Sequence, residues 1–263
     1  MRAGHAFVTG ASQGLGRYLA EALADAGWQV VGIGLRLEPK AAGAHTGPGD
    51  AHSDRSGTFR YVQADLSDSE TLPRVTSSLQ QRPDLVVHCA VSYPERTEGA
   101  ADLLDLERTF RVNALAPYLL TLDLLDGTPG DHFTCVVVIN SEAIFSADRN
   151  SAPYAASKAA LRVLTAGLAD GCRSRNGAVA TLLLGPLGDP RKESELQAIA
   201  DKRGVSAEEV TRVFLRQSNP NLVIDSLIDY ASCLASVEYI ASLGPVANGM
   251  VCRLDGQSAG SLI

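Results

Sequence analysis

The chain has 263 residues, 45% of them apolar, with 30 acidic against 23 basic side chains and a formal net charge of −7. This length suits one α/β domain or at most two small ones. The acidic balance lacks the basic surface that attracts nucleic acids or anionic membranes, so neither is expected as a partner. The sequence contains neither a signal-peptide pattern nor an apolar run that could span a membrane, which predicts a cytoplasmic protein.

The cysteines and histidines do not have the spacing of a metal site. The five cysteines are dispersed without a CxxC pair, which is typical of buried thiols in a reducing compartment. None of the five histidines has the spacing of a zinc motif. We therefore predict no metal, and we interpret His45 and His52, which lie in a Gly- and Pro-rich stretch, as solvated.

A strand, a glycine-rich turn and a helix are predicted at the beginning of the chain. An apolar run at 6–9 is followed by GASQGLG at 10–16 and by a helical pattern over 17–27. Glycines let a backbone approach a pyrophosphate closely, and a helix N-terminus supplies N–H donors and the positive end of a dipole. The order of these elements indicates a dinucleotide-binding turn.

The spacing Gly-x-x-x-Gly-x-Gly after Thr9 resembles the TGxxxGxG signature of the short-chain dehydrogenase/reductase family, and the resemblance continues to Gly256. It implies a Rossmann-like, doubly wound sheet of about seven parallel strands with helices on both faces. It also implies a single NAD(P)-binding domain over residues 1–263. The turn residues expected to contact the cofactor are Gly10, Ser12, Gln13, Gly14, Leu15 and Gly16.

The second strand, predicted at 29–34, ends where the adenosine ribose lies in such a fold. An acidic residue there selects NAD, whereas a basic one suits the 2′-phosphate of NADP. Here Arg36 follows the strand, and no acid occurs before Glu38. A guanidinium can form a bidentate contact with a phosphate, so we expect NADP, with NAD as the less favoured cofactor. The alternative is that Arg36 is a solvated loop residue.

The next stretch, residues 37–57, is predicted to be a long loop with one helical turn near 40–42. A third strand is predicted at 59–64, and the family resemblance assigns Asp65 and Leu66, directly after it, to the adenine. A fourth strand is predicted at 85–90. It ends where the family has Asn-Asn-Ala-Gly, and of these only Ala90, expected to contact the cofactor, matches.

His88, Cys89 and Val91 depart from that family pattern. We interpret His88 as a core histidine that replaces a structural asparagine, with a catalytic base as the alternative. A long helix is predicted at 102–125, with Asn113 inside its apolar stripe. The resemblance implies that Asn113 is the family's catalytic asparagine, which supports a water chain to the active-site lysine. The alternative is an asparagine satisfied by ordinary hydrogen bonds.

Three polar residues follow in the order expected of a catalytic site. Ser141 comes directly after an apolar run at 133–140, which predicts a buried parallel strand. Tyr154 and Lys158 are four residues apart, on one face of a helix predicted over 154–175. A nearby ammonium favours tyrosinate and lowers a phenol pKa from about 10 toward the working pH. In the family the serine also precedes the tyrosine by thirteen residues.

The last third of the chain contains further expected elements. A strand is predicted at 178–184, and Pro186 after it is expected to contact the cofactor, although the family's Pro-Gly order is inverted and Leu187 departs. A charged, helical stretch within about 187–221 is expected to be the substrate lid. A helix at 224–242 and a final strand at 249–256 complete the prediction.

The resemblance implies an oxidoreductase that reduces a ketone with NADPH through Ser141, Tyr154, Lys158 and Asn113. The alternatives are an alcohol dehydrogenase that works oxidatively and a non-catalytic dinucleotide-binding protein that acts by interaction. The expected substrate is a bulky hydrophobic or aromatic carbonyl compound, possible in polyketide-type secondary metabolism. The family also implies a homo-oligomer, a tetramer or a dimer, that assembles through the helices at 102–125 and 154–175. The candidate pocket residues are Val91, Ser92, Tyr93, Glu142, Ile144, Phe145 and Leu187.

Overall fold

The computed structural model describes residues 3–37, 57–94, 102–126, 132–147 and 150–258. They form a seven-stranded sheet of order β3-β2-β1-β4-β5-β6-β7 in which every neighbouring pair is parallel. The direction of winding reverses between β1 and β4, as in doubly wound folds. The strands are β1 (His5–Thr9), β2 (Gln29–Gly34), β3 (Thr58–Gln63), β4 (Leu85–His88), β5 (Thr134–Ser141), β6 (Gly177–Leu184) and β7 (Val251–Leu254).

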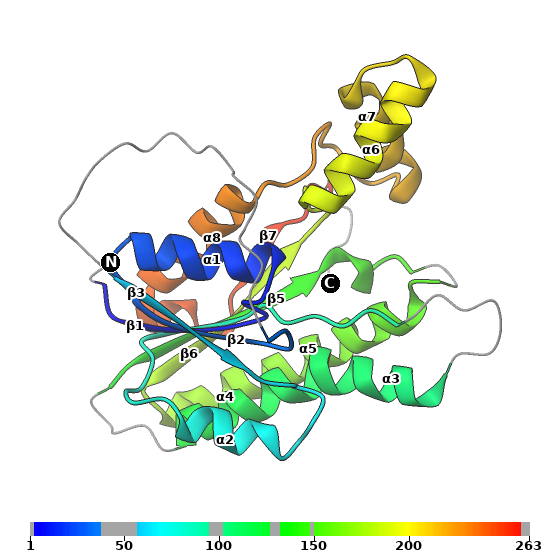
Figure 1. Cartoon of the computed structure of the whole chain (residues 1–263). Helices are drawn as coiled ribbons and strands as arrows, with labels where there is room; N and C mark the ends of the chain where they lie inside the picture. Colours follow the sequence, from blue (N-terminus) through cyan, green and yellow to red (C-terminus); the bar gives the residue numbers. More distant parts are fainter. Residues whose placement is uncertain (1–2, 38–56, 95–101, 127–131, 148–149, 259–263) are drawn as a thin grey trace.

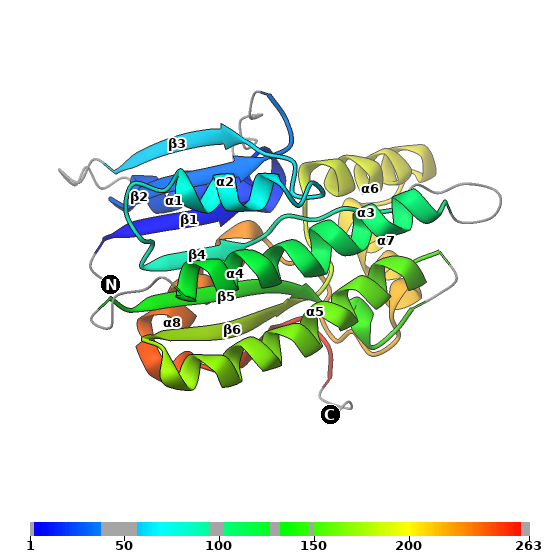
Figure 2. The ribbon, with the colours of Figure 1, turned by 90° about the horizontal axis from the view of Figure 1, so that it is seen from below.

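Helices cover both faces of this sheet (Figure 1, Figure 2). One face is covered by α1 (Gly14–Asp25) and α8 (Tyr230–Ser242). The other is covered by α2 (Thr71–Ser77), α4 (Ala116–Asp126) and α5 (Ala152–Gly171). The predicted Rossmann-like architecture is therefore confirmed, with a core on each side of the sheet.

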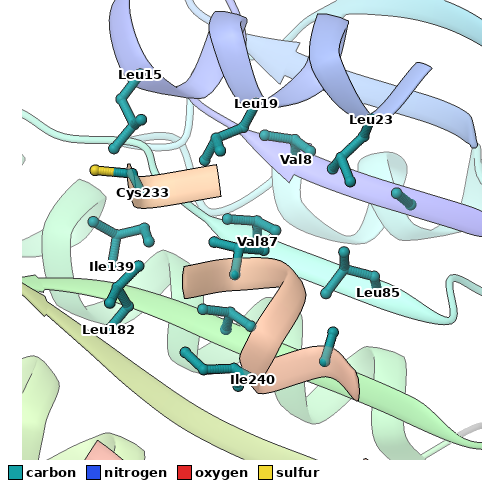
Figure 3. Packing of buried hydrophobic residues seen from close by; sticks show 14 of the residues in the cluster. Val8, Leu15, Leu19, Leu23, Leu85, Val87, Ile139, Leu182, Cys233 and Ile240 are labelled. Carbon is teal, nitrogen blue, oxygen red and sulfur yellow. The ribbon is translucent and has the colours of Figure 1, made fainter. Parts of the chain in front are cut away.

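Side-chain alternation along the strands divides the core between the two faces. On β5, Val136 and Val138 pack toward α4 and α5, whereas Val137 and Ile139 pack toward α1 and α8. Successive strand residues point to opposite faces, so a strand that is buried on both sides must be apolar throughout. Figure 3 shows the core on the α1 and α8 side of the sheet, in which leucines of α1 contact valines of the sheet and Ile240 of α8. Each fully buried aliphatic side chain contributes roughly 2 kcal/mol.

The helix predicted at 102–125 is present but has a wider turn in its middle. It consists of α3 (Leu103–Phe110), a π-helical turn at Arg111–Leu115 and α4. Single π turns interrupt α-helices mostly at functional sites, and this one contains Asn113. In the helix at 154–175, α5 begins two residues earlier and ends in the 3-10 turn Cys172–Ser174.

Two further helices, α6 (Pro190–Arg203) and α7 (Ala207–Ser218), stand away from the sheet beside its carboxyl edge (Figure 1). Asp189 and Ser206 accept hydrogen bonds from the first turns of these helices. The link between them contains Gly204 at φ 67°, a left-handed conformation that favours glycine. Leu196, Ala200 and Val210 form a small core of their own. The helical pattern predicted from 191 is thus confirmed.

The helix predicted from residue 224 was placed too early. It begins at Tyr230, because the Asp229 side chain accepts a hydrogen bond from the Ser232 N–H and caps the helix there. The preceding residues are irregular, with bends at 225–226, and Ile228 bridges to Leu187. The predictions for the loop at 38–56, including its helical turn, Glu38, His45 and His52, lie outside the described residues. Among the helices that the structure describes, none is both long and apolar enough to cross a bilayer.

Candidate active site

The predicted site residues gather at the carboxyl ends of β1, β4 and β5, around the point where the winding reverses. The turn after β1 is tightly packed. Gly10 has φ 78°, and a Cβ there would lie 2.8 Å from the Ala90 backbone. A Cβ on Gly16 would lie 2.5 Å from the Gly10 carbonyl oxygen. These two glycines are therefore required for α1 to approach the ends of β1 and β4.

The N-terminus of α1 has the chemistry of an anion site. Its first turn carries no acidic residue, and Gln13 at the N-cap makes no side-chain capping bond. The first N–H groups of the helix are thus available to a phosphate, and the helix dipole favours negative charge there. Ser12 and Leu15 are buried beneath the turn, and Ser12 packs against Gly34 of β2. The turn fits a dinucleotide pyrophosphate.

The residues expected near the adenosine lie along the ends of β2 and β3. Arg36 is exposed directly after β2, and its carbonyl oxygen accepts a 2.7 Å hydrogen bond from the Tyr61 hydroxyl. The Asp65 carboxylate accepts hydrogen bonds from the backbone N–H and hydroxyl of Ser67. Asp65 and Leu35 line a cavity of about 310 Å³ between these strand ends and α2. Leu66 is buried beside it.

The end of β4 is held by a residue that sequence reasoning did not single out. The Thr9 hydroxyl accepts 3.1 Å hydrogen bonds from the backbone N–H groups of both Cys89 and Ala90. Although this segment departs from the family's Asn-Asn-Ala-Gly, the backbone N–H groups of Cys89 and Ala90 therefore have hydrogen-bond acceptors. Cys89 is itself partly buried, and burial raises the pKa of its thiol to about 12.

His88 is a neutral core histidine, as predicted. It is 4% exposed, and burial lowers its pKa to about 3. Its Nε2 lies 3.0 Å from the Thr121 hydroxyl, which donates to the Pro117 carbonyl oxygen. Nε2 therefore carries the proton in this arrangement and donates it to Thr121, so Nδ1 is an acceptor. Nδ1 has no hydrogen-bond partner among the described residues.

Lys158 and Tyr154 lie in the first turns of α5. Lys158 is 4% exposed, and its Nζ donates a 3.0 Å hydrogen bond to the Ile139 carbonyl oxygen of β5. Burial lowers the pKa of this lysine to about 8. The Asn140 side chain donates to the Lys158 carbonyl oxygen and accepts from the Ser141 N–H. One amide thus joins the catalytic end of β5 to α5.

The pKa of Tyr154 differs from the sequence expectation. Burial raises this pKa well above its ordinary value, the Tyr93 side chain raises it further, and the hydrogen bond to Ser141 lowers it. Lys158, which was expected to lower this pKa, is not among the groups that shift it, and its ammonium donates a hydrogen bond to the Ile139 carbonyl oxygen. The hydroxyls of Ser141 and Tyr154 are nevertheless brought together as the spacing predicts.

Tyr93 is stacked on Tyr154. Their ring centroids are 4.6 Å apart and the rings are inclined by 27°. Tyr93 remains 64% exposed, so it forms an outer cover over the partly buried Tyr154. This places one of the candidate pocket residues in direct contact with the catalytic candidate.

Asn113 is 1% exposed, and its side chain is occupied by structural contacts. Oδ1 accepts from the Ser92 N–H at 2.7 Å, while Nδ2 donates to the Ser92 carbonyl oxygen and to the Ser157 hydroxyl. These are the ordinary hydrogen bonds of the alternative interpretation. Asn113 thereby fixes the segment before Tyr93 against α5, next to the candidate catalytic residues.

The remaining candidates are divided between two places. Pro186 lies at the carboxyl end of β6, where its carbonyl oxygen accepts from the Ile228 N–H. Ile144 and Phe145 line a separate cavity of about 180 Å³, together with Asn140, Arg162, Thr181, Leu183, Val251 and Arg253. None of Ser141, Tyr154 and Lys158 lines it. The expected apolar pocket therefore does not include Ile144 and Phe145 in this arrangement.

Within the part of the chain that the structure describes, no three His, Cys, Asp or Glu side chains come together as a possible metal site. The chemistry of the site is instead that of a phosphate-binding turn beside a hydroxyl, a phenol and an ammonium. The residues fit a nicotinamide dinucleotide, because glycines form the cradle and a helix N-terminus points at it.

Comparison with known proteins identifies the class. The family described as short chain dehydrogenase matches residues 4–197. The chain belongs to this family of oxidoreductases, which act on CH–OH or C=O groups with a nicotinamide dinucleotide. A relative from Bacillus subtilis (strain 168), the uncharacterized oxidoreductase YvaG, is 25% identical over 255 residues, which cover 95% of this chain and 94% of the relative.

Two solved structures are similar to this chain. The 4-hydroxyisoleucine dehydrogenase complexed with NADH has a TM-score of 0.74 at 18% identity, over 98% of this chain and 100% of the other. The FolM alternative dihydrofolate reductase 1 from Brucella canis, complexed with NADP, has a TM-score of 0.69 at 22% identity. The similarity covers 97% of this chain and 93% of the FolM chain. At these identities both establish the fold alone.

Proposed function

We propose that this protein is an NADPH-dependent oxidoreductase that reduces a ketone to a secondary alcohol. The observation that carries the proposal is the pairing of the Ser141 and Tyr154 hydroxyls where β5 ends and α5 begins, with Lys158 four residues after Tyr154 in α5. The bound cofactor supplies the hydride, and the protein supplies position and proton transfer.

In this proposal Ser141 donates a hydrogen bond to the substrate carbonyl oxygen. Tyr154 gives that oxygen its proton as the hydride arrives at the carbonyl carbon, which leaves an alcohol and a tyrosinate. The Lys158 ammonium, in the same helix, contacts the nicotinamide ribose, and it stabilises the tyrosinate once it turns from the Ile139 carbonyl oxygen toward the phenol. Asn113 holds the site together through Ser92 and Ser157 and supports the water relay that returns a proton.

The preference for NADP is part of the proposal. Arg36 lies at the end of β2, where a 2′-phosphate would be recognised, and no carboxylate stands at residues 35–37. The remaining contacts are assigned to Gly10–Gly16, Asp65, Leu66, Ala90 and Pro186. NAD is the less favoured cofactor, and one structural neighbour contains NADH.

The organisation of the chain supports a lid and an oligomer. We propose one domain over 1–263, in which α6 and α7, within about 187–221, close over a bulky hydrophobic or aromatic ketone, as in polyketide-type metabolism. Exposed apolar side chains on α4 and α5, such as Leu119 and Val163, support a homo-oligomer, a tetramer or dimer. All five cysteines are free, which supports a reducing, cytoplasmic location.

The alternatives are alcohol oxidation and a non-catalytic binding role. Fluorescence titration with NADPH and NADH, followed by cofactor consumption with a panel of aromatic, polycyclic and small polar ketones, distinguishes them. We expect tighter NADPH binding and turnover of bulky ketones. Turnover of small polar ketones alone would contradict the substrate class. Cofactor binding without turnover in either direction would favour the interaction protein.

A further inference from the structure

Glu142 follows Ser141 directly and is bonded to two distant parts of the chain. It begins the 3-10 turn Glu142–Ile144 and is partly buried. Its Oε2 accepts a 2.8 Å hydrogen bond from Asn219 Nδ2 and a 2.5 Å hydrogen bond from Gln257 Nε2. A single carboxylate oxygen therefore joins the end of β5 to residues 77 and 115 positions away.

Both donors belong to segments that lie beside the site. Asn219 is the C-cap of α7, is 2% exposed, and accepts from the Asn221 N–H through its own Oδ1. Gln257 follows β7 and forms an antiparallel bridge with Leu222. The Val223 N–H donates to the Gly256 carbonyl oxygen and extends this pairing. The exit of the α6–α7 unit and the C-terminal segment are thus paired with each other, and Glu142 is bonded to both.

The charges around Glu142 leave its carboxylate without a cationic partner among the hydrogen bonds described. The guanidinium of Arg253 is bonded through Nε and Nη2 to Asp255, which is 4% exposed. Burial and the Asp255 charge raise the pKa of Glu142, while the Asn219 and Gln257 hydrogen bonds lower it. The charge of Glu142, like Tyr93, also raises the pKa of Tyr154.

We propose that Glu142 is a positioning residue that fastens the exit of the α6–α7 unit and the C-terminal segment to the catalytic end of β5. The inference rests on the proposed function, because it gives the fastened segments a role in holding the substrate against Ser141 and Tyr154. Charge-assisted hydrogen bonds of this kind are stronger than neutral ones. Loss of the contact releases the substrate side of the site, whereas the sheet and the glycine turn keep their own contacts.

The two properties of Glu142, its hydrogen bonds and its charge, can be separated by substitution. Glu142→Gln keeps an oxygen that can accept both hydrogen bonds but removes the charge. Gln257→Ala removes one of these hydrogen bonds and keeps the charge. Asn219→Ala removes the other, together with the bond that its Oδ1 accepts from the Asn221 N–H, and Glu142→Ala removes both hydrogen bonds and the charge. Glu238→Gln, on the exposed face of α8, is the matched control for loss of a carboxylate.

Steady-state kinetics in the direction of alcohol oxidation test the role of Glu142 in substrate binding. Asn219→Ala and Gln257→Ala should raise KM for the substrate about 5- to 10-fold, the effect of one hydrogen bond. Glu142→Gln should change KM little but move the rising limb of the pH profile to lower pH, because the nearby negative charge is lost. Glu142→Ala should do both. Wild-type KM in all three alanine variants would overturn the proposal, as would an unshifted profile in Glu142→Gln.

Hydrogen exchange of the amides in α6 and α7 tests the contact without turnover. Glu142→Ala and Gln257→Ala should accelerate exchange there, and Glu238→Gln should not. Unchanged exchange would overturn the fastening even in an active enzyme, and faster exchange with wild-type KM would overturn its role in substrate binding. If NADPH binds but no carbonyl is reduced by the wild type, the proposed function fails, while the exchange result still decides the contact.

Discussion

The ring of Tyr93 lies 4.6 Å from the ring of Tyr154, close enough and parallel enough to stack. Tyr93 belongs to the segment after β4, and Asn113 holds the neighbouring Ser92 on both its N–H and its carbonyl oxygen. The position of Tyr93 over the Tyr154 phenol is therefore fixed through the π turn of the long helix. The segment after β4, whose sequence departs from the family pattern, therefore contacts the residue proposed to transfer the proton, Tyr154 of α5.

Substitution of Tyr93 by Phe should change the titration of Tyr154. The hydrogen bond with Tyr93 raises the pKa of Tyr154, so loss of the Tyr93 hydroxyl should lower the pKa of Tyr154 while the stacked ring stays. In the proposed mechanism Tyr154 is the base in alcohol oxidation, and the rising limb of kcat/KM against pH should therefore move to lower pH. A shift to higher pH would show that Tyr93 lowers, and does not raise, the pKa of Tyr154.

Lys158→Met should stabilise the fold while it removes activity. The pKa of Lys158 is about 8 in the folded protein against an ordinary 10.5, so the buried ammonium opposes folding at neutral pH. Linkage gives a cost of about 3 kcal/mol at pH 7 and about 1 kcal/mol at pH 9.5, because the folded state releases its proton first. Loss of the hydrogen bond to Ile139 destabilises the variant by about 1 kcal/mol and offsets part of this gain.

Urea unfolding at the two pH values measures this effect. The variant should be more stable than the wild type by about 1–2 kcal/mol at pH 7, and the difference should shrink or vanish at pH 9.5. A variant that is less stable at pH 7, or an advantage that grows with pH, would contradict the buried charge.

His88→Asn should make the protein less sensitive to acid. The pKa of His88 is lowered from 6.5 to about 3 by burial, so below pH 6.5 only the unfolded chain takes up the proton. Above pH 6.5 the histidine is neutral in both states and does not lower the free energy of unfolding. As the pH falls from 6.5 toward 3, protonation of the unfolded chain lowers the free energy of unfolding. Between pH 7.5 and 5.5 the wild type should lose about 1 kcal/mol more unfolding free energy than the variant. Equal losses would show that this ring is protonated inside the fold.

Arg36→Ala should change the choice of cofactor. If the guanidinium contacts the 2′-phosphate, its loss should raise KM for NADPH about 10-fold or more and leave KM for NADH nearly unchanged. Arg60, an exposed arginine on β3, provides the matched control as Arg60→Ala. Equal effects of Arg36→Ala on both cofactors would mean that Arg36 does not read the phosphate.

Features set by short-range patterns could be predicted from the sequence. The continuous apolar run of β5 identified a strand buried on both faces, and the interval between Ser141 and Tyr154 placed two hydroxyls together. The start of α8 was missed because an irregular stretch, in which Ile228 bridges to Leu187, comes before the Asp229 cap. Helical periodicity does not report such a bridge, since it depends on a strand end from elsewhere in the chain.

Contacts between distant residues could not be predicted. The hydrogen bonds of Thr9 to the end of β4 join residues about 80 positions apart, and those of Glu142 span 77 and 115. Nothing in the local pattern of either residue indicates its partners. Similarly, the aromatic character of Phe145 suggested a substrate pocket, whereas the fold turns it toward Arg162 and Arg253.

The central claim is that the Tyr154 hydroxyl transfers the proton, and Tyr154→Phe tests it directly. The variant should bind NADPH as the wild type does, yet reduce the ketone about 100-fold to 10,000-fold more slowly, the usual contribution of a general acid. Tyr239→Phe, which removes the same hydroxyl from an exposed position on α8, should keep full activity. A Tyr154→Phe enzyme with wild-type kcat and normal NADPH binding would contradict the account.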